Sequence, residues 1–228
     1  MPSTPRSTRI EASSPPGNKP IPAKAVFINC PFDAGYQPLL RAACFTILAC
    51  GNAPRCALDY IDGGIVRFSR IVDLIAECEM SIHDISRTEL DPATGLPRFN
   101  MPLELGADLG LRLKGSPRQR RRKTLILDAR AHQYDVTLSD ISGMDIAAHG
   151  NDQAQVIRHV RDWLNANREP DTPPLAGALA IRADYEAYLQ ILPDITANLR
   201  LDAILTHIDF IETVKLALPR IEAARQSD

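Results

Sequence analysis

Short apolar runs alternate with amphipathic segments of helical period along residues 24–168, and this alternation constrains the fold more than any other feature. Residues 25–30 (AVFINC) form a continuous apolar run, the pattern of a strand buried on both faces of a parallel sheet. Residues 37–50 follow with apolar side chains near helical spacing, and Gly51 is suited to end that helix. The chain therefore opens with a strand followed by a helix.

The same unit repeats along the chain. Further strands are predicted at residues 53–59, 80–85, 124–128 and 145–148, and further helices at residues 66–78, 101–113 and 153–167. A strand has to cross over the sheet before it pairs in parallel with the next one, so this pattern predicts a parallel sheet with helices on both faces. We expect a flavodoxin-like, doubly wound α/β fold with five strands in the order 2-1-3-4-5.

The two ends of the chain differ from this central domain. Residues 1–23 are rich in Ser, Pro, Thr and Arg, and such a composition buries too little apolar surface to offset the cost of ordering. They are predicted to be a disordered leader. Residues 169–228 begin with a linker at 169–174 and are predicted to form a helical appendage that packs on the domain or joins a second copy or partner protein. Its helices are expected at residues 180–191, 193–205 and 207–224.

Composition excludes several classes of protein. The net charge of −2 and the pI near 6.2 argue against nucleic acid as a partner, and the basic run at residues 118–123 is predicted to be a solvated loop. No stretch of about eighteen apolar residues would span a membrane, so a cytoplasmic protein is expected. The five cysteines form no CxxC pair and no Cys/His cluster with metal spacing, so they are predicted to be reduced core thiols with no metal site.

Two carboxylates are predicted at the carboxyl ends of the strands, where such sheets bind ligands. Pro102 suits the first turn of a helix and would place Glu104 in that turn, where the helix dipole keeps a carboxylate ionised and exposed. Glu104 then serves as a nucleophile or stabilises an oxocarbenium-like cation, or it only offsets the free N–H groups of its helix. Asp84, at the exit of strand three, is expected to bind a ribose hydroxyl or a base edge, or to cap the next turn.

The neighbouring loops supply the candidate substrate-binding residues. These are Asn29, Phe32, Asp33, Ser86, Arg87, Arg98, Asn100 and Met101. The first three are expected to contact a base or sugar, and the alternative is an Asx turn with the ring of Phe32 packed beneath it. The two arginines are expected to donate to phosphates, with Arg67 as a weaker candidate, and His83 is expected to point into the sheet layer.

Three segments carry a resemblance to known proteins. They are residues 27–33 (FINCPFD), 82–87 (IHDISR) and 96–106 (LPRFNMPLELG). Residues 26–163, about 60% of the chain, resemble bacterial proteins of the Toll/interleukin-1 receptor (TIR)-like and nucleoside 2-deoxyribosyltransferase-like superfamily. Both kinds of enzyme place a catalytic glutamate on the helix after strand three, and the deoxyribosyltransferase motif is similar to Glu104-Leu105-Gly106. The resemblance implies that Glu104 is the nucleophile of a reaction that cleaves an N-glycosidic bond.

The leading functional prediction is an NAD-cleaving hydrolase that takes NAD or a related nucleotide as substrate and needs no cofactor. Glu104 would stabilise or trap the ribosyl cation while Asp84 orients the sugar. The alternatives are a deoxyribosyltransferase, in which Asp84 acts as the general acid, and a non-catalytic nucleotide sensor or adaptor that signals through its C-terminal helices. Defence against phage would suit the hydrolase and the sensor by analogy. The sequence lacks the tryptophan-cysteine pattern of many TIR enzymes, so the substrate stays open.

Overall fold

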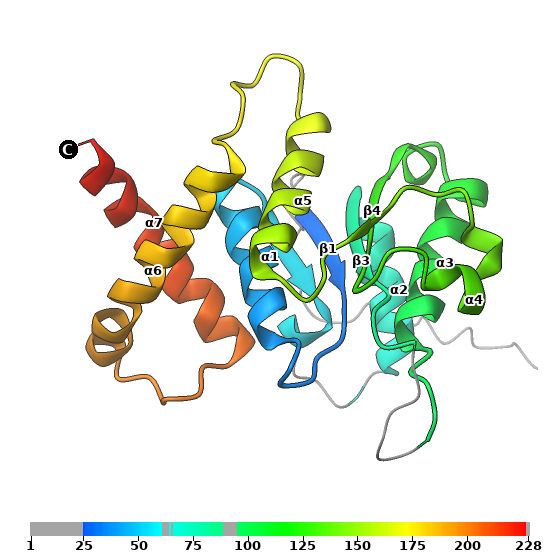
Figure 1. Cartoon of the computed structure of the whole chain (residues 1–228), viewed down its shortest axis with the longest axis horizontal. Coiled ribbons are helices and arrows are strands. Elements are labelled where there is room, and N and C mark those ends of the chain that lie inside the picture. Colours follow the sequence, from blue (N-terminus) through cyan, green and yellow to red (C-terminus); the bar gives the residue numbers. More distant parts are fainter. Residues whose placement is uncertain (1–24, 61–63, 65, 89–94, 227–228) are drawn as a thin grey trace, which may run out of the picture.

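Five parallel strands form one sheet in the order β2-β1-β3-β4-β5, which confirms the predicted flavodoxin-like α/β fold (Figure 1). The computed structural model describes residues 25–60, 64, 66–88 and 95–226, so the predicted leader at residues 1–23 lies outside it. The strands are β1 (Ala25–Asn29), β2 (Ala53–Cys56), β3 (Met80–Asp84), β4 (Lys123–Asp128) and β5 (Ile146–Ala148). The second strand is shorter than predicted because the chain turns into the 3₁₀ helix η1 (Ala57–Asp59).

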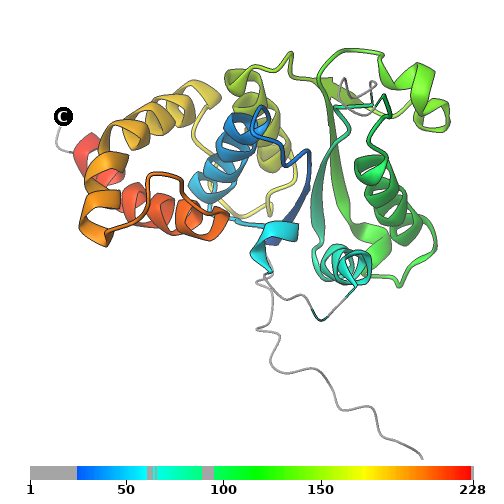
Figure 2. The ribbon, with the colours of Figure 1, turned by 90° about the horizontal axis from the view of Figure 1, so that it is seen from below.

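Helices cover both faces of the sheet, with α1 and α5 on one face and α2 and α3 on the other (Figure 2). The helices are α1 (Gln37–Ala49), α2 (Arg67–Glu77), α3 (Asn100–Lys114), α4 (Tyr134–Thr137), α5 (Gln153–Ala166), α6 (Ala178–Leu199) and α7 (His207–Arg225). Short 3₁₀ turns η2 (Gln119–Arg121) and η3 (Ser139–Ile141) lie in the second half of the domain. Among the described residues, no helix has the length and apolar character needed to cross a bilayer.

The central strand β1 shows why the sequence folds in this way. All five of its residues are buried, and successive side chains point to opposite faces of the sheet. Val26 and Ile28 pack in the cluster that includes α1 and α5, whereas Phe27 packs in the cluster that includes α2. Each such side chain contributes roughly 1.5–3 kcal/mol on burial. The continuous apolar run is therefore required, because neither face of β1 meets solvent.

The C-terminal helices share one hydrophobic core with α1. The ring of Phe45 in α1 lies 5.1 Å from that of Tyr185 and 5.6 Å from that of Tyr188, both in α6. Tyr188 also packs edge-on against Phe210 of α7, with ring centroids 5.9 Å apart. Such aromatic pairs add stability beyond the area that they bury. Helices α6 and α7 are thereby fixed to the outer side of α1 (Figure 1).

Helix α6 runs without a break through Pro193, so the predicted boundary between helices at residues 191 and 193 is wrong. Proline lacks the N–H that would bond to the carbonyl of Leu189, one turn earlier. Both residues are exposed, so solvent can reach that carbonyl, and Ile195 just beyond is buried in the core. The packing of the helix on its neighbours thus outweighs the local preference of proline for a helix end.

Candidate functional site

The carboxylate of Asp84 lies at the end of β3 and accepts hydrogen bonds on both oxygens. Its Oδ1 accepts from the backbone N–H of Ser86 at 2.9 Å, which is the turn-capping alternative considered for this residue. Its Oδ2 accepts from the hydroxyl of Tyr36, in the loop that leads into α1, and lies 2.9 Å from Nε2 of His149. Asp84 is only 1% exposed. It therefore joins the loops that follow three different strands.

His149 follows β5 directly and is fully buried. Its Nδ1 accepts a hydrogen bond from the backbone N–H of Asn151 at 3.0 Å, so the ring proton lies on Nε2, which faces Asp84. The turn that makes this contact has two successive residues in the left-handed region, Gly150 with φ 59° and Asn151 with φ 57°. Glycine and asparagine are the residues that tolerate this region best.

These contacts determine the charge of Asp84. Burial alone would raise its pKa, but the hydrogen bonds from His149, Ser86 and Tyr36 outweigh burial and hold the pKa below its usual value. Asp84 is consequently ionised at neutral pH and has no proton to donate. It acts on the site by holding Tyr36 and His149 in place.

Glu104 lies in the second turn of α3, so its predicted place in the first turn is wrong. The helix begins at Asn100, two residues before Pro102, and its first turn contains no acidic residue. A carboxylate in the second turn lies beyond the free N–H groups and cannot cap them. The predicted capping role therefore does not apply to Glu104.

The carboxylate of Glu104 makes no hydrogen bond or ion pair with any other residue in the described part of the chain. The residue is 8% exposed, and burial raises its pKa to about 7, opposed only by the positive charge of Arg67 at the start of α2. The expectation of an ionised and exposed carboxylate is thus wrong, because burial removes water from this side chain and favours its protonated form. Such a group holds a proton about half of the time near neutral pH.

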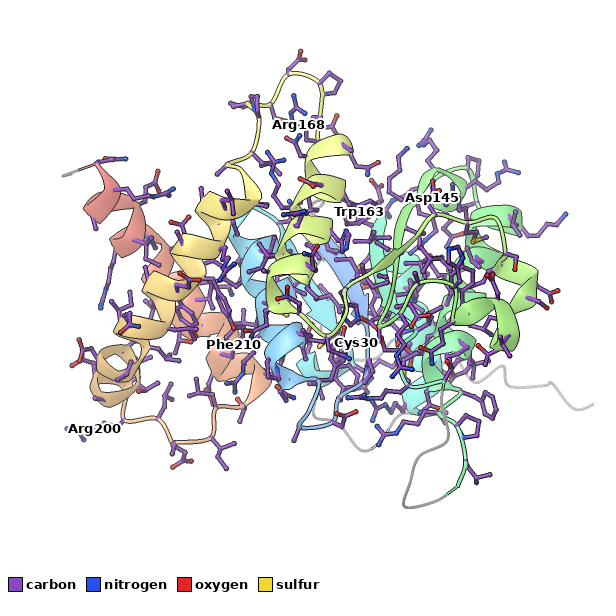
Figure 3. All side chains as sticks on the ribbon, in the orientation of Figure 1. Cys30, Asp145, Trp163, Arg168, Arg200 and Phe210 are labelled. Carbon is purple, nitrogen blue, oxygen red and sulfur yellow. The ribbon has the colours of Figure 1, made fainter. Side chains whose placement is uncertain are left out.

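The charges of Asp84 and Glu104 both affect the pKa of the thiol of Cys30, the first residue after β1. Burial raises the pKa of this thiol well above its usual value, and the charges of Asp84 and Glu104 raise it further. The two carboxylates therefore belong to one region at the carboxyl end of the sheet. Figure 3 labels Cys30 near the middle of the molecule. Its thiol stays protonated, which excludes it as a nucleophile.

A third acid of this region, Asp128 at the end of β4, was not predicted. It is 1% exposed, and neither oxygen has a partner in hydrogen-bonding geometry within the described residues. Burial raises its pKa, and the negative charge of Asp84 raises it further, while the nearby N–H groups of Ala129 and Arg130 and the ring of His149 oppose the shift. Asp128 is therefore protonated more readily than an ordinary aspartate.

Asn29 and Met101 join the strands to α3. The amide of Asn29 donates to the carbonyl oxygen of Met101 at 2.8 Å and lies 3.0 Å from Nδ1 of His83. The register of the sheet places Asn29 beside His83. His83 is fully buried, as predicted. These contacts fix the start of α3, and with it Glu104, against the ends of β1 and β3.

Three of the predicted substrate-binding residues, Asp33, Arg87 and Arg98, form a charged group that we call the rim of the site. Asp33 accepts the backbone N–H of Tyr36 on Oδ1 at 3.0 Å, which is the turn structure considered as its alternative role. Its Oδ2 lies 3.4 Å from Nε of Arg87 and 3.4 Å from Nη1 of Arg98. Arg87 has φ 77°, a conformation that costs free energy in a non-glycine residue and is enriched at functional sites.

The remaining predicted residues are less closely associated with Glu104. Phe32 lines a cavity of about 310 Å³ beside α7, and Asn100 is exposed at the first position of α3. Ser86 is buried, and its hydroxyl oxygen lies 3.2 Å from Nε2 of His149. Ser86 therefore supports the buried network, whereas Asn100 remains accessible to a ligand.

The basic run is not entirely a solvated loop, so that prediction is wrong for Arg122. This side chain is among the largest that are fully buried, and its Nε lies 2.6 Å from Oδ1 of Asp108 in α3. Asp108 also accepts hydrogen bonds from the hydroxyls of Ser81 and Thr124, at 3.0 and 2.9 Å. Burial opposes its ionisation, but His83, Arg122 and Thr124 hold its pKa below the usual value. This network fixes α3 to β3 and β4.

Three residues that shape the site were missed in the sequence. Asp128 and His149 directly end or follow strands, so the rule that found Asp84 would have found them too. Tyr36 has no such signal, because only the fold brings its hydroxyl to Asp84 across 48 positions of sequence.

No protein-family profile, curated protein or solved structure matches this chain, so its function has to be inferred from the geometry of this site.

Proposed function

We propose that this chain is a nucleotide N-glycosidase that hydrolyses the nicotinamide–ribose bond of NAD, with Glu104 beside the reacting carbon. The observation that carries the proposal is the buried Glu104 carboxyl, which has no hydrogen-bonding partner in the described residues and a pKa of about 7. Strongly shifted acids of this kind are concentrated in active sites. The resemblance of residues 96–106 to glycosidic-bond-cleaving enzymes supports the same residue.

The chemistry requires little from the protein. The electron pair of the broken C–N bond moves onto the pyridinium nitrogen, so nicotinamide leaves as a neutral molecule without a general acid. The ribosyl cation that remains is stabilised by the ionised carboxylate of Glu104, which is poorly solvated and therefore interacts strongly. Water then adds to the anomeric carbon and loses a proton, which a carboxylate with a pKa of about 7 can accept.

Arg87 and Arg98 supply the positive charge that a diphosphate requires. Both lie at the rim, where Nε of Arg87 and Nη1 of Arg98 are each 3.4 Å from Oδ2 of Asp33, so two guanidinium groups meet at one carboxylate. Their side chains are 36% and 45% exposed, so phosphate oxygens can approach them. In this proposal the rim binds the phosphates and Glu104 faces the nicotinamide ribose.

The state of Asp84 favours hydrolysis of NAD over deoxyribosyl transfer. Transfer between bases needs a general acid near the departing base nitrogen, and Asp84 was the candidate. Its pKa lies below the usual value and both of its oxygens accept hydrogen bonds, so it has no proton to give. A neutral leaving group removes this requirement.

The test incubates the purified full chain with NAD and follows nicotinamide release by chromatography. We expect release that rises with pH through about 7, as Glu104 loses its proton, and that falls at least ~100-fold in Glu104→Gln. The control Glu186→Gln removes an exposed carboxylate on α6 and should release nicotinamide at the wild-type rate. Equal release by wild type and Glu104→Gln, or base exchange with deoxynucleosides in place of nicotinamide release, would overturn the proposal.

A further inference from the structure

Three metal-binding side chains converge where α7 meets the edge of the sheet. Cys56 ends β2, Asp59 lies in η1, and His207 is the first residue of α7. The Sγ of Cys56 lies 3.4 Å from Nε2 of His207 and 3.9 Å from Oδ1 of Asp59, and the same Nε2 lies 3.4 Å from that oxygen. Each residue thus directs one donor atom at a common point, although His207 is 151 positions from Cys56 in the sequence.

The spacing of the three atoms fits a zinc ion. A triangle with sides of 3.4, 3.4 and 3.9 Å has its corners about 2.1 Å from a common centre. Zinc is bound at about 2.3 Å by thiolate, about 2.0 Å by imidazole and about 2.1 Å by carboxylate. An ion slightly out of the plane of the three donors would meet all three distances without movement of the backbone.

A hydrogen-bonded triad explains the cluster less well. In a Cys–His–Asp relay the thiol and the carboxylate contact different ring nitrogens, whereas here both approach Nε2 of His207. That nitrogen has either one proton or one lone pair to share, so it bonds one neighbour, and if this is Asp59 the thiol has only a long contact of 3.9 Å with the same carboxylate oxygen. Cys56 is also fully buried, which keeps a substrate from its sulfur. A cation is the partner that satisfies all three donors together.

The contacts around the cluster orient the donors. The second oxygen of Asp59, Oδ2, binds Nε of Arg55 at 2.6 Å and the backbone N–H of Cys56 at 3.2 Å, which turns Oδ1 toward His207. Thr206 caps α7 by accepting the backbone N–H of Asp209 at 3.1 Å, and so fixes the turn that carries His207. Outer contacts of this kind hold metal ligands in place in known sites.

A cavity lies beside His207, one of the three proposed ligands. It has a volume of about 310 Å³, and its lining includes Leu58, Thr206, His207 and Phe210. Phe210 is labelled in Figure 3, on the side of the C-terminal helices. Three protein ligands and one water complete a tetrahedral zinc shell. The thiolate and the carboxylate together neutralise a divalent charge.

We propose that Cys56, Asp59 and His207 bind one zinc-class divalent cation, which fastens the start of α7 to the β2 edge of the sheet. The sequence predicts no metal site, because His207 lies 151 positions from Cys56 and the three donors form no recognisable spacing. This site is separate from Glu104, and its test does not depend on the proposed reaction.

The test strips the purified full chain with a chelator, dialyses it and titrates it with Co²⁺ alone, which reports its ligands by absorption. We expect one equivalent to bind, with a sulfur-to-cobalt charge-transfer band in the near ultraviolet. Zn²⁺ should displace it and raise the unfolding temperature. His207→Gln should lower the affinity for Co²⁺ at least ~100-fold, and Cys56→Ser should abolish the charge-transfer band.

The matched control is Cys78→Ser, which removes a different buried thiol and should keep both the band and the affinity. Each variant is compared with and without metal, so a loss of stability common to both states does not affect the result. Failure of the wild-type chain to bind one equivalent would overturn the proposal. So would a charge-transfer band that persists in Cys56→Ser or an unchanged affinity in His207→Gln.

Discussion

Glu104 and Asp108 lie one turn apart on the same helix, α3, and have opposite environments. Asp108 is fully buried, contacts Arg122 and accepts two hydroxyl donors, and its pKa is held below the usual value. Glu104 is 8% exposed, has no such partner among the described residues, and its pKa is raised to about 7. Burial acts against ionisation at both positions, so the partners decide the outcome. Asp108 serves the structure, and Glu104 remains available for chemistry.

The largest expected effect on stability comes from replacing Asp108, the carboxylate that contacts Arg122. Asp108→Asn removes the charge that faces Arg122 and leaves a fully buried guanidinium without its counterion. We expect a loss of about 3–5 kcal/mol in the free energy of unfolding, measured by urea denaturation at pH 7. The control Asp162→Asn removes an exposed carboxylate from its pair with Arg161, whose guanidinium keeps its hydrogen bonds to the carbonyls of Leu175 and Ala176, and should cost less than about 1 kcal/mol. Equal losses in the two variants would show that the Asp108 network is not structural.

Glu104 should respond in the opposite direction. Its pKa rises from about 4.5 to about 7 on folding, so the native state binds the proton more tightly and stability falls as pH rises from about 4.5 through 7. Glu104→Gln removes this penalty, and we expect it to be up to ~3 kcal/mol more stable than wild type at pH 8.5, with no such gain at pH 4. Denaturation at the two pH values measures the difference. A variant less stable than wild type at pH 8.5 would indicate that Glu104 has a partner.

Asp84, like Asp108 and unlike Glu104, is held ionised by its partners, so removing a partner should lower the stability of the fold. Tyr36→Phe keeps the ring and removes the hydroxyl that donates to Asp84. Oδ2 of this buried carboxylate then loses one of its hydrogen bonds. We expect a loss of about 1–3 kcal/mol in the free energy of unfolding at pH 7, again by urea denaturation. A second tyrosine, Tyr60, offers the control, because Tyr60→Phe removes a hydroxyl whose hydrogen-bonding partner among the described residues is the partly exposed Arg55. No loss in Tyr36→Phe would contradict the role given to Asp84.

The smallest effect concerns Arg67. This exposed side chain lowers the pKa of Glu104, so Arg67→Gln should move the pH midpoint of nicotinamide release upward without removing the activity. The measurement is a pH–rate profile of the variant beside wild type. A midpoint that moves downward would mean that Arg67 does not act on Glu104 through its charge.

The sequence predicts the sheet well and the charge of its site poorly, for one physical reason. The parallel sheet follows from the alternation of apolar runs and crossover helices, which is a local pattern, and the expected strand order is that of the flavodoxin-like type. The ionisation of Glu104 depends on how much water reaches it, and the roles of Asp84 and Arg122 depend on partners that are distant in the chain. Such contacts leave no local signal. The starting residue of α3 shows the same limit, because Asn100 and Met101 extend the helix ahead of Pro102.

Glu104 is a buried residue whose carboxyl has no hydrogen-bonding partner in the part of the chain that the structure describes, and its proposed function depends on this state. The most direct measurement is a ¹³C NMR titration of chain labelled at the glutamate carboxyl carbon, with Glu104→Gln used to assign the signal. We expect the Glu104 signal to titrate with a pKa of about 7. A midpoint at or below the usual value of about 4.5 would contradict the claim, because it would require a partner that stabilises the charged form.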